Sequence, residues 1–72
     1  MYFRRLGDLR NDKDKTQRDI AKYLHMNLEV YRRYEKGLRE IPVWALLKLA
    51  DYYQTSTDYL LGRTDDPSAP RA

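Results

Sequence analysis

Apolar residues recur every three or four positions along most of the chain, which is the spacing that gives an α-helix one apolar face. Polar stretches and glycine or proline residues interrupt this pattern and predict turns between helices. The periodic segments are residues 2–11, 16–24, 27–37, 42–53 and 56–62. No segment alternates apolar and polar residues in the manner of a half-buried strand. The sequence therefore predicts an all-α fold, a compact bundle of five short helices.

The second segment begins with the pattern of a capping box. The Thr16 hydroxyl can accept from a free amide of the first turn, and Asp19, three residues later, can accept from the Thr16 amide. Ile20, Ala21 and Leu24 follow on one stripe at helical spacing. The pattern predicts a short amphipathic helix whose basic residues lie off this stripe.

The third segment predicts a second helix after a tight turn. His25 and Met26 form the turn, and Asn27 is a candidate N-cap. Gly37 ends the helix, because glycine takes the left-handed conformation without a side-chain penalty. The residues expected to face the second helix are Val30, Tyr31 and Tyr34, and those expected to face outward are Leu28, Glu29, Arg32, Arg33 and Lys36.

Two helices joined by about three residues, the second with an outward arginine-bearing face, have the geometry that places a helix in the DNA major groove. An ordinary helical hairpin with a solvated charged face has the same spacing. Both interpretations stay open on spacing alone.

The first helix is expected over residues 2–11. One face is expected to carry Phe3, Leu6, Leu9 and Arg10, and the outside Arg4, Arg5 and Asp8. Residues 11–15 are too polar to bury and predict a loop. Pro42 is expected at the first position of the fourth helix, where its missing amide donor is not needed. The apolar face of that helix is expected to consist of Val43, Leu46, Leu47, Ala50 and Tyr53.

The fourth helix also carries Trp44 off its expected stripe, either as a lid on the edge of the core or as part of an interface. Ser56 or Thr57 caps the last helix, and Gly62 ends it. Residues 64–72 hold two prolines and no large apolar residue, and we expect a disordered tail there.

Composition narrows the class of protein. Seventy-two residues allow one domain with a small core. There is no cysteine, which excludes a disulfide scaffold and a cysteine-ligated zinc site. The net charge of +3 is uneven: residues 1–48 hold 12 Lys or Arg against 7 Asp or Glu, and residues 49–72 hold 2 against 4. The basic part contains the two-helix motif, which favours a nucleic-acid partner, although such a charge run is also typical of a solvated face.

Several fragments occur in order along the chain: TQ and then IA in the second helix, YEKG at the end of the third, and LLKLADYY followed by STDYLLG. With this order of helices, residues 2–63 resemble the Cro/phage-repressor type of helix-turn-helix, the xenobiotic-response-element family of bacterial and phage transcriptional regulators. The resemblance implies a lambda-repressor-like DNA-binding domain over residues 1–63. His25 departs from the family, which usually has glycine in the turn, and Tyr31 replaces a usual aliphatic residue.

The resemblance also implies roles for single residues. The base-reading candidates are Asn27, Leu28, Glu29, Arg32 and Arg33, and the DNA backbone candidates are Gln17, Lys36 and Arg39. Arg10 and Glu35 match a family pair that forms a structural salt bridge. The chemistry agrees, since arginine matches guanine O6 and N7, glutamate accepts from cytosine N4, and leucine suits a thymine methyl.

The principal hypothesis is a cytoplasmic, sequence-specific transcriptional regulator, a repressor that binds a palindromic operator in double-stranded DNA as a homodimer. The candidate dimer contacts are Tyr59, Leu60 and Leu61, for which closing the open end of the bundle is an equally good explanation. A second hypothesis is a protein-interaction module, such as an antitoxin or accessory factor that covers a partner protein. An enzyme is disfavoured, because the single histidine has no partner for metal or catalytic work, and no cofactor or metal is expected.

Overall fold

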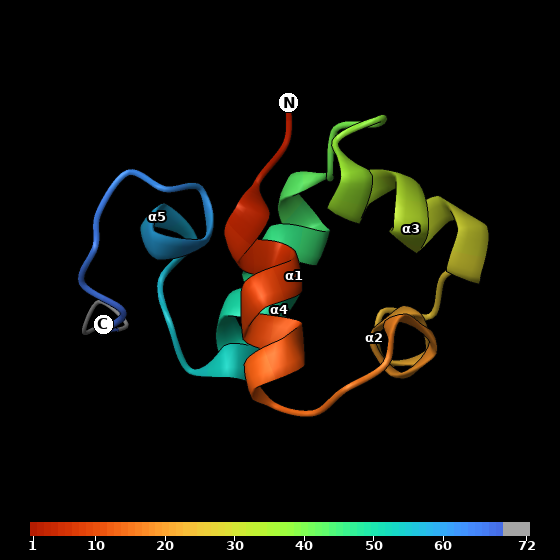
Figure 1. Cartoon of the computed structure of the whole chain (residues 1–72), viewed down its shortest axis with the longest axis horizontal. Coiled ribbons are helices and arrows are strands. Elements are labelled where there is room, and N and C mark those ends of the chain that lie inside the picture. The colour runs from red at the N-terminus through yellow and green to blue at the C-terminus, as the bar shows by residue number, and fades with distance from the viewer. Residues whose placement is uncertain (69–72) are drawn as a thin grey trace.

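α1 (Arg4–Asp12) crosses the middle of the molecule, with two groups of helices around it (Figure 1). α2 (Gln17–Tyr23) and α3 (Leu28–Lys36) pack against each other on one side. α4 (Val43–Tyr53) contacts α5 (Thr57–Leu60), which lies on the other side. The computed structural model describes residues 1–68, and within them there are five helices and no strand. The predicted all-α bundle of five short helices is confirmed.

All five helices contribute to one hydrophobic core. Leu6 of α1, Ile20 of α2, Tyr31 of α3 and Leu49 of α4 are each 0 % exposed, and Leu60 of α5 is 1 % exposed. Removing side chains of this size from water stabilises the fold by about 1.5–3 kcal/mol each. Because the interior holds the bundle together, the outward faces of the helices are not needed for folding and are available for other contacts.

Side-chain caps determine where three of the helices begin. The Asp19 amide donates to Thr16 Oγ1 at 3.0 Å, and the Thr16 amide donates back to Asp19 Oδ2 at 2.9 Å, which confirms the predicted capping box. The hydrogen bond from the Thr16 amide lowers the pKa of Asp19. Asn27 Oδ1 accepts from the Glu29 amide at 2.7 Å, and Ser56 caps α5.

A residue with positive φ stands at each end of the segment that runs from the turn between α2 and α3 to the end of α3. His25, with φ of 55°, takes the left-handed conformation in the turn. Gly37, with φ of 76°, ends α3, as predicted. A Cβ added to Gly37 would also lie 2.7 Å from Cα of Tyr2. The position therefore requires glycine both for its conformation and for the close approach of another backbone segment.

Three predicted helix boundaries are wrong by one or two residues. α1 begins at Arg4 and not at residue 2, and after Asn11 it continues through Asp12, into the predicted loop over residues 11–15. The polar side chains of these residues are expected to contact water, and they do so on the solvent face of a helix just as they would in a loop. Pro42 is the N-cap of α4 and not its first residue, since its ψ of 155° is extended and its carbonyl accepts from the Leu46 amide at 3.1 Å.

The buried face of α4 differs from the predicted one. The buried residues of this helix are Ala45, Leu46, Leu49, Ala50 and Tyr53. Val43 is 70 % exposed and Leu47 is 54 % exposed, so their assignment to the core face is wrong. Because α4 is apolar on more than one side, periodicity alone does not determine which side is buried. Trp44, 49 % exposed, lies with Val43 and Leu47 among the large apolar side chains that face solvent.

The Arg5 side chain does not lie outside the bundle as predicted but joins α1 to the chain after α5. It donates to the carbonyl oxygens of Tyr59 at 2.9 Å and Thr64 at 2.5 Å. It also pairs with Asp65 at 2.6 Å, and its guanidinium carbon lies 4.0 Å from the centre of the Tyr59 ring. These contacts involve residues more than 50 positions away in sequence, so the local apolar pattern around Arg5 carried no sign of them.

Polar contacts also attach the chain after α5 to the bundle. Thr55 Oγ1 donates to the Pro67 carbonyl at 2.6 Å, in addition to the contacts that Arg5 makes with Thr64 and Asp65. For residues 64–68 this differs from the predicted disorder, because backbone carbonyls provide an attachment that needs no apolar side chain. Residues 69–72, the remainder of the predicted tail, lie outside the described residues.

The dimer candidates on α5 divide into a core residue and two partly exposed ones. Leu60 is 1 % exposed, so its assignment to a dimer surface is wrong. Leu61 packs partly against the core, and Tyr59 lies partly exposed beneath the Arg5 guanidinium. With one turn of helix there is no periodicity from which the sequence could separate these roles.

Candidate nucleic-acid interface

The outer face of α3 is positioned by apolar side chains beneath it. Ile20, Ala21 and Leu24 of the α2 segment and Tyr31 of α3 are all at most 3 % exposed in the core that the two helices share. The polar residues on the opposite side of α3 are left facing solvent, among them Glu29, Arg33 and Lys36.

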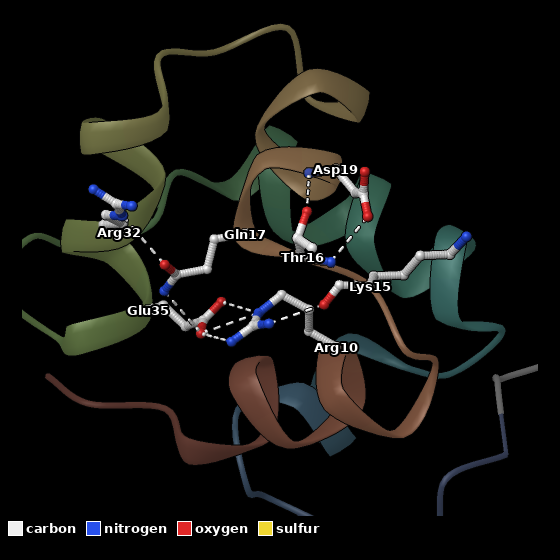
Figure 2. Close-up of polar contacts among 7 residues, drawn as sticks. All are labelled: Arg10, Lys15, Thr16, Gln17, Asp19, Arg32 and Glu35. Carbon is white, nitrogen blue, oxygen red and sulfur yellow. Dashed lines mark hydrogen bonds and ion pairs between the residues drawn. The ribbon is translucent and has the colours of Figure 1, made fainter.

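A bidentate ion pair ties α3 to α1 (Figure 2). Arg10 Nη2 donates to Glu35 Oε1 at 2.8 Å, and Arg10 Nε donates to Glu35 Oε2 at 2.9 Å. Arg10 Nη1 donates in addition to the Lys15 carbonyl at 2.9 Å. The two side chains are only 15 % and 10 % exposed. The structure thus contains the pair that the resemblance implies, at a place where it fixes helices rather than faces a ligand.

Both charges of this pair are maintained inside the protein. Burial raises the pKa of Glu35, but hydrogen bonds and charge from Arg10, with smaller contributions from Tyr31 and Gln17, outweigh it, so the pKa of Glu35 lies below its ordinary value. The hydrogen bond to Glu35 raises the pKa of Arg10. A buried carboxylate on α3 is therefore ionised but neutralised, and contributes little repulsion toward a polyanion.

Two tyrosine hydroxyls lie buried near this pair. Neither the Tyr31 nor the Tyr53 hydroxyl has a hydrogen-bond partner among the described residues. Burial raises the pKa of both groups, and the negative charge of Glu35 raises it further. These tyrosines are neutral core residues, and Tyr31 fills the space where the resembling family usually has an aliphatic side chain.

Gln17 connects the ion pair to the outer face of α3 (Figure 2). Its Nε2 donates to Glu35 Oε1 at 3.3 Å, and its Oε1 accepts from Arg32 Nε at 3.2 Å. The resemblance implies a DNA backbone contact for Gln17. In the structure Gln17 also contacts α3, at Glu35 and at Arg32 in the middle of that helix.

Arg32 makes a second contact, within α3 itself. Its Nη1 pairs with Glu29 Oε1 at 2.5 Å, three residues earlier on the same helix. The side chains of Arg32 and Glu29 are 43 % and 62 % exposed, so the pair lies at the surface. The two base-reading candidates are therefore paired with each other and not independent of one another.

The other candidates differ in how accessible they are. Arg33, Lys36 and Arg39 are exposed, and among the described residues their side chains make no hydrogen bond or ion pair. Leu28 faces outward less than expected, because it packs partly against the core. Asn27 uses its side-chain oxygen to cap α3, which leaves its amide nitrogen for other partners.

Arg18 belongs to the same surface although the sequence did not single it out. A shallow hollow between the start of α2 and α3 is lined by Thr16, Gln17, Arg18, Leu28 and Arg32. Two arginines are among these lining residues. The signal in the sequence was the place of Arg18 next to Gln17 in the first turn of a helix that leads into the predicted motif.

A comparison with protein families covers this entire arrangement. Residues 6–60, from α1 to the end of α5, match the family model described as Helix-turn-helix. The chain belongs to the helix-turn-helix family. The resemblance to the Cro/phage-repressor type is confirmed at the level of this family, which is one of DNA-binding domains and not of enzymes. In this domain α2 and α3 form the motif, and α3 occupies the place of the recognition helix.

Three relatives of this helix-turn-helix domain come from Bacillus subtilis (strain 168). The chain is 37 % identical over 67 residues to the uncharacterized HTH-type transcriptional regulator YobD, covering 93 % of the chain and 60 % of the relative. It is 36 % identical over 62 residues to the HTH-type transcriptional regulator ImmR, covering 86 % and 49 %. It is 37 % identical over 73 residues to the HTH-type transcriptional regulator AnsR, covering 100 % and 63 %. The chain therefore spans about half to two thirds of the length of these relatives.

No solved structure matches the helix-turn-helix domain with significant similarity. Among residues 1–68, no set of three or more histidine or acidic side chains is arranged to hold a metal ion. No helix in the same range has the length and apolar character needed to cross a bilayer.

Proposed function

We propose that this helix-turn-helix domain binds double-stranded DNA sequence-specifically as a transcriptional regulator, with α3 in the major groove. The observation that carries the proposal is the outward face of α3, which combines Arg32, Arg33 and Lys36 with a helix anchored from behind by the buried Arg10–Glu35 pair. Anchoring matters because a helix that reads bases has to hold its side chains in register with the base pairs.

The exposed cations of this interface are suited to different parts of the DNA. Arg33 is the candidate for direct readout, since its guanidinium has no partner among the described residues and matches the two acceptors of guanine. Lys36 and Arg39, at the end of α3 and in the following loop, are the candidates for phosphate. Asn27 keeps its side-chain amide nitrogen for the DNA, whereas both polar groups of the Gln17 amide already have partners, which leaves the second Nε2 hydrogen for the backbone.

We further propose that the protein acts as a repressor that occupies a palindromic operator as a homodimer. One small domain covers limited DNA surface, and two-fold related recognition helices would meet half-sites about one helical turn apart. Tyr59 and Leu61 remain the dimer candidates on α5. The three relatives named as transcriptional regulators support a regulatory role for this chain.

A protein partner is the alternative use of the bundle, and the exposed side of α4 favours it. Val43, Trp44 and Leu47 are large apolar side chains of α4 that are 70 %, 49 % and 54 % exposed. Sedimentation of the purified protein distinguishes the two cases. We expect a two-fold dimer without other chains, whereas a stable monomer that forms a complex only with a second gene product would favour the interaction module.

The DNA proposal is tested by titrating labelled duplexes while the salt concentration is varied. Affinity should fall with salt at a log–log slope of about −0.9 per phosphate contact. Lys36→Ala should weaken binding on all duplexes alike and reduce the slope by about 1, whereas Arg33→Ala should relax the preference at one base pair. Arg63→Ala is the matched control, because Arg63 is an exposed cation just after α5, the helix that lies across α1 from α3 (Figure 1). Binding without salt dependence, or equal loss in the control, would count against the proposal.

A further inference from the structure

The Arg32 guanidinium is held at two atoms by groups from two helices, and Figure 2 shows the first of these contacts, with Gln17. Its Nε donates to Gln17 Oε1 of α2, and its Nη1 to Glu29 Oε1 of α3. Gln17 in turn donates to Glu35, which is fixed by Arg10. Arg32 is therefore a surface arginine whose orientation derives from a chain of polar contacts that reaches back to α1.

These contacts leave a defined part of the guanidinium for a ligand. An arginine carries five N–H groups, one on Nε and two on each terminal nitrogen. With Nε and one hydrogen of Nη1 in use, one hydrogen of Nη1 and both of Nη2 are unpartnered among the described residues. The remaining donors lie on Nη1 and Nη2, the two nitrogens of the terminal fork of Arg32, and the adjacent Glu29 carboxylate keeps further acceptor positions beside them.

On the strength of the proposed DNA-binding function, we propose that Glu29 and Arg32 act as one unit that selects a guanine–cytosine base pair. Guanine offers two neighbouring acceptors, O6 and N7, which match the terminal fork of Arg32. The cytosine of the same pair offers its N4 amino group, which matches the Glu29 carboxylate. The ion pair between the two side chains stays intact in this arrangement.

An adenine–thymine pair suits the unit less well. Adenine places an N6 donor beside its N7 acceptor, so one arm of the arginine fork meets a donor. Phosphate suits it less well too, because Glu29 would bring a negative charge toward the DNA backbone or lose its ion pair with Arg32. Glu29 thus acts by rejecting wrong partners as well as by accepting from the right one.

Gln17 is a positioning residue in this scheme. Its amide joins Arg32 to the Glu35 carboxylate, and these side chains lie on two helices that pack together. Loss of that amide should let the guanidinium turn away from the fixed orientation, and so broaden the base preference without removing the cation. A residue that only contacted phosphate would change affinity on all sequences by the same factor.

The test is to select bound sequences from random duplex DNA with the wild type, Glu29→Gln, Arg32→Gln and Gln17→Ala. Glu40→Gln, which removes one exposed negative charge from the loop after α3, is the matched control for charge. In the wild type we expect one guanine–cytosine position per half-site to be preferred by roughly 5- to 150-fold, the usual value of a good bidentate contact. Thermal unfolding followed by circular dichroism verifies that each variant is folded.

Glu29→Gln and Arg32→Gln should each remove the preference at that same position, and Gln17→Ala should reduce it. Glu29→Gln should also bind arbitrary duplex DNA more tightly than Glu40→Gln does. Enrichment by the wild type together with an unchanged profile in Glu29→Gln would overturn this inference alone. A wild type that enriches no sequence would overturn the proposed function as well.

Discussion

Arg10 and Glu35 face each other across α1 and α3, with Arg10 Nη2 2.8 Å from Glu35 Oε1 and Arg10 Nε 2.9 Å from Glu35 Oε2. Both side chains are at least 85 % shielded from solvent, and Gln17 donates to the same carboxylate. This pair lies directly behind the proposed DNA-binding face, so it connects the stability of the bundle to the position of α3.

Arg10→Met should destabilise the protein strongly. Removal of one partner from a buried ion pair leaves the other charge uncompensated, which typically costs about 3 kcal/mol. Urea unfolding measures the change, and Glu40→Gln, an exposed acidic position, should stay within about 0.5 kcal/mol of the wild type. If Arg10→Met also stayed within that range, the pair would be an ordinary surface contact.

The same pair predicts how stability depends on pH. Since the pKa of Glu35 is lower in the folded protein than its ordinary value, its contribution is complete above the unfolded pKa, about 4.3, and is lost as the pH falls through the folded pKa. Urea midpoints measured from pH 6 down to pH 3 should therefore fall more steeply for the wild type than for Glu35→Gln. Parallel curves for the two proteins would contradict the lowered pKa. Asp19, whose pKa is also lowered, is present in both proteins and cancels from the comparison.

Alanine variants of Gly37 and Gly62 can be compared to test the close approach of the backbone of Tyr2 to the end of α3. Their φ values are 76° and 79°, so alanine meets a similar conformational penalty of about 1–2 kcal/mol at each. A Cβ at Gly37 would lie 2.7 Å from Tyr2 Cα, whereas a Cβ at Gly62 has no neighbour within 4 Å. Gly37→Ala should therefore lower the melting temperature clearly more than Gly62→Ala. Equal losses would mean that the N-terminal segment moves aside without cost.

Leu60 and Leu61 separate core packing from association. Leu60→Ala should cost about 2–5 kcal/mol of unfolding free energy, because Leu60 is 1 % exposed. Leu61→Ala removes a side chain that is only partly buried, and should cost less stability while it weakens the proposed dimer. Urea unfolding and sedimentation equilibrium measure the two effects on the same samples. A dimer unaffected by Leu61→Ala would move the interface away from α5.

The features that were predicted correctly from the sequence arise from residues that are close together along the chain. The Thr16–Asp19 capping box and the left-handed Gly37 arise within one helical turn, so residue type and spacing suffice to predict them. The apolar face of α4 was predicted wrongly because α4 is apolar on several sides, and only packing against the rest of the bundle selects Ala45 and Leu49 over Val43 and Leu47.

The polar contacts of the candidate interface were harder to predict for a different reason. The residues Gln17, Glu29 and Arg32 were each identified as DNA-binding candidates, but their bonds to one another depend on side-chain conformations across two helices. Arg5 presents the same difficulty over a longer range, since its partners Tyr59 and Thr64 lie more than 50 residues away. Sequence spacing contains no information about either arrangement.

Selection of bound sequences from random duplex DNA at near-physiological salt tests the central claim most directly. We expect the wild-type protein to enrich a palindrome whose half-sites lie about one helical turn apart, each with a preferred guanine–cytosine pair. Such a motif would support specific binding and two-fold symmetry in one experiment. Recovery of no common sequence, with affinity equal on all duplexes, would contradict the claim that α3 reads DNA.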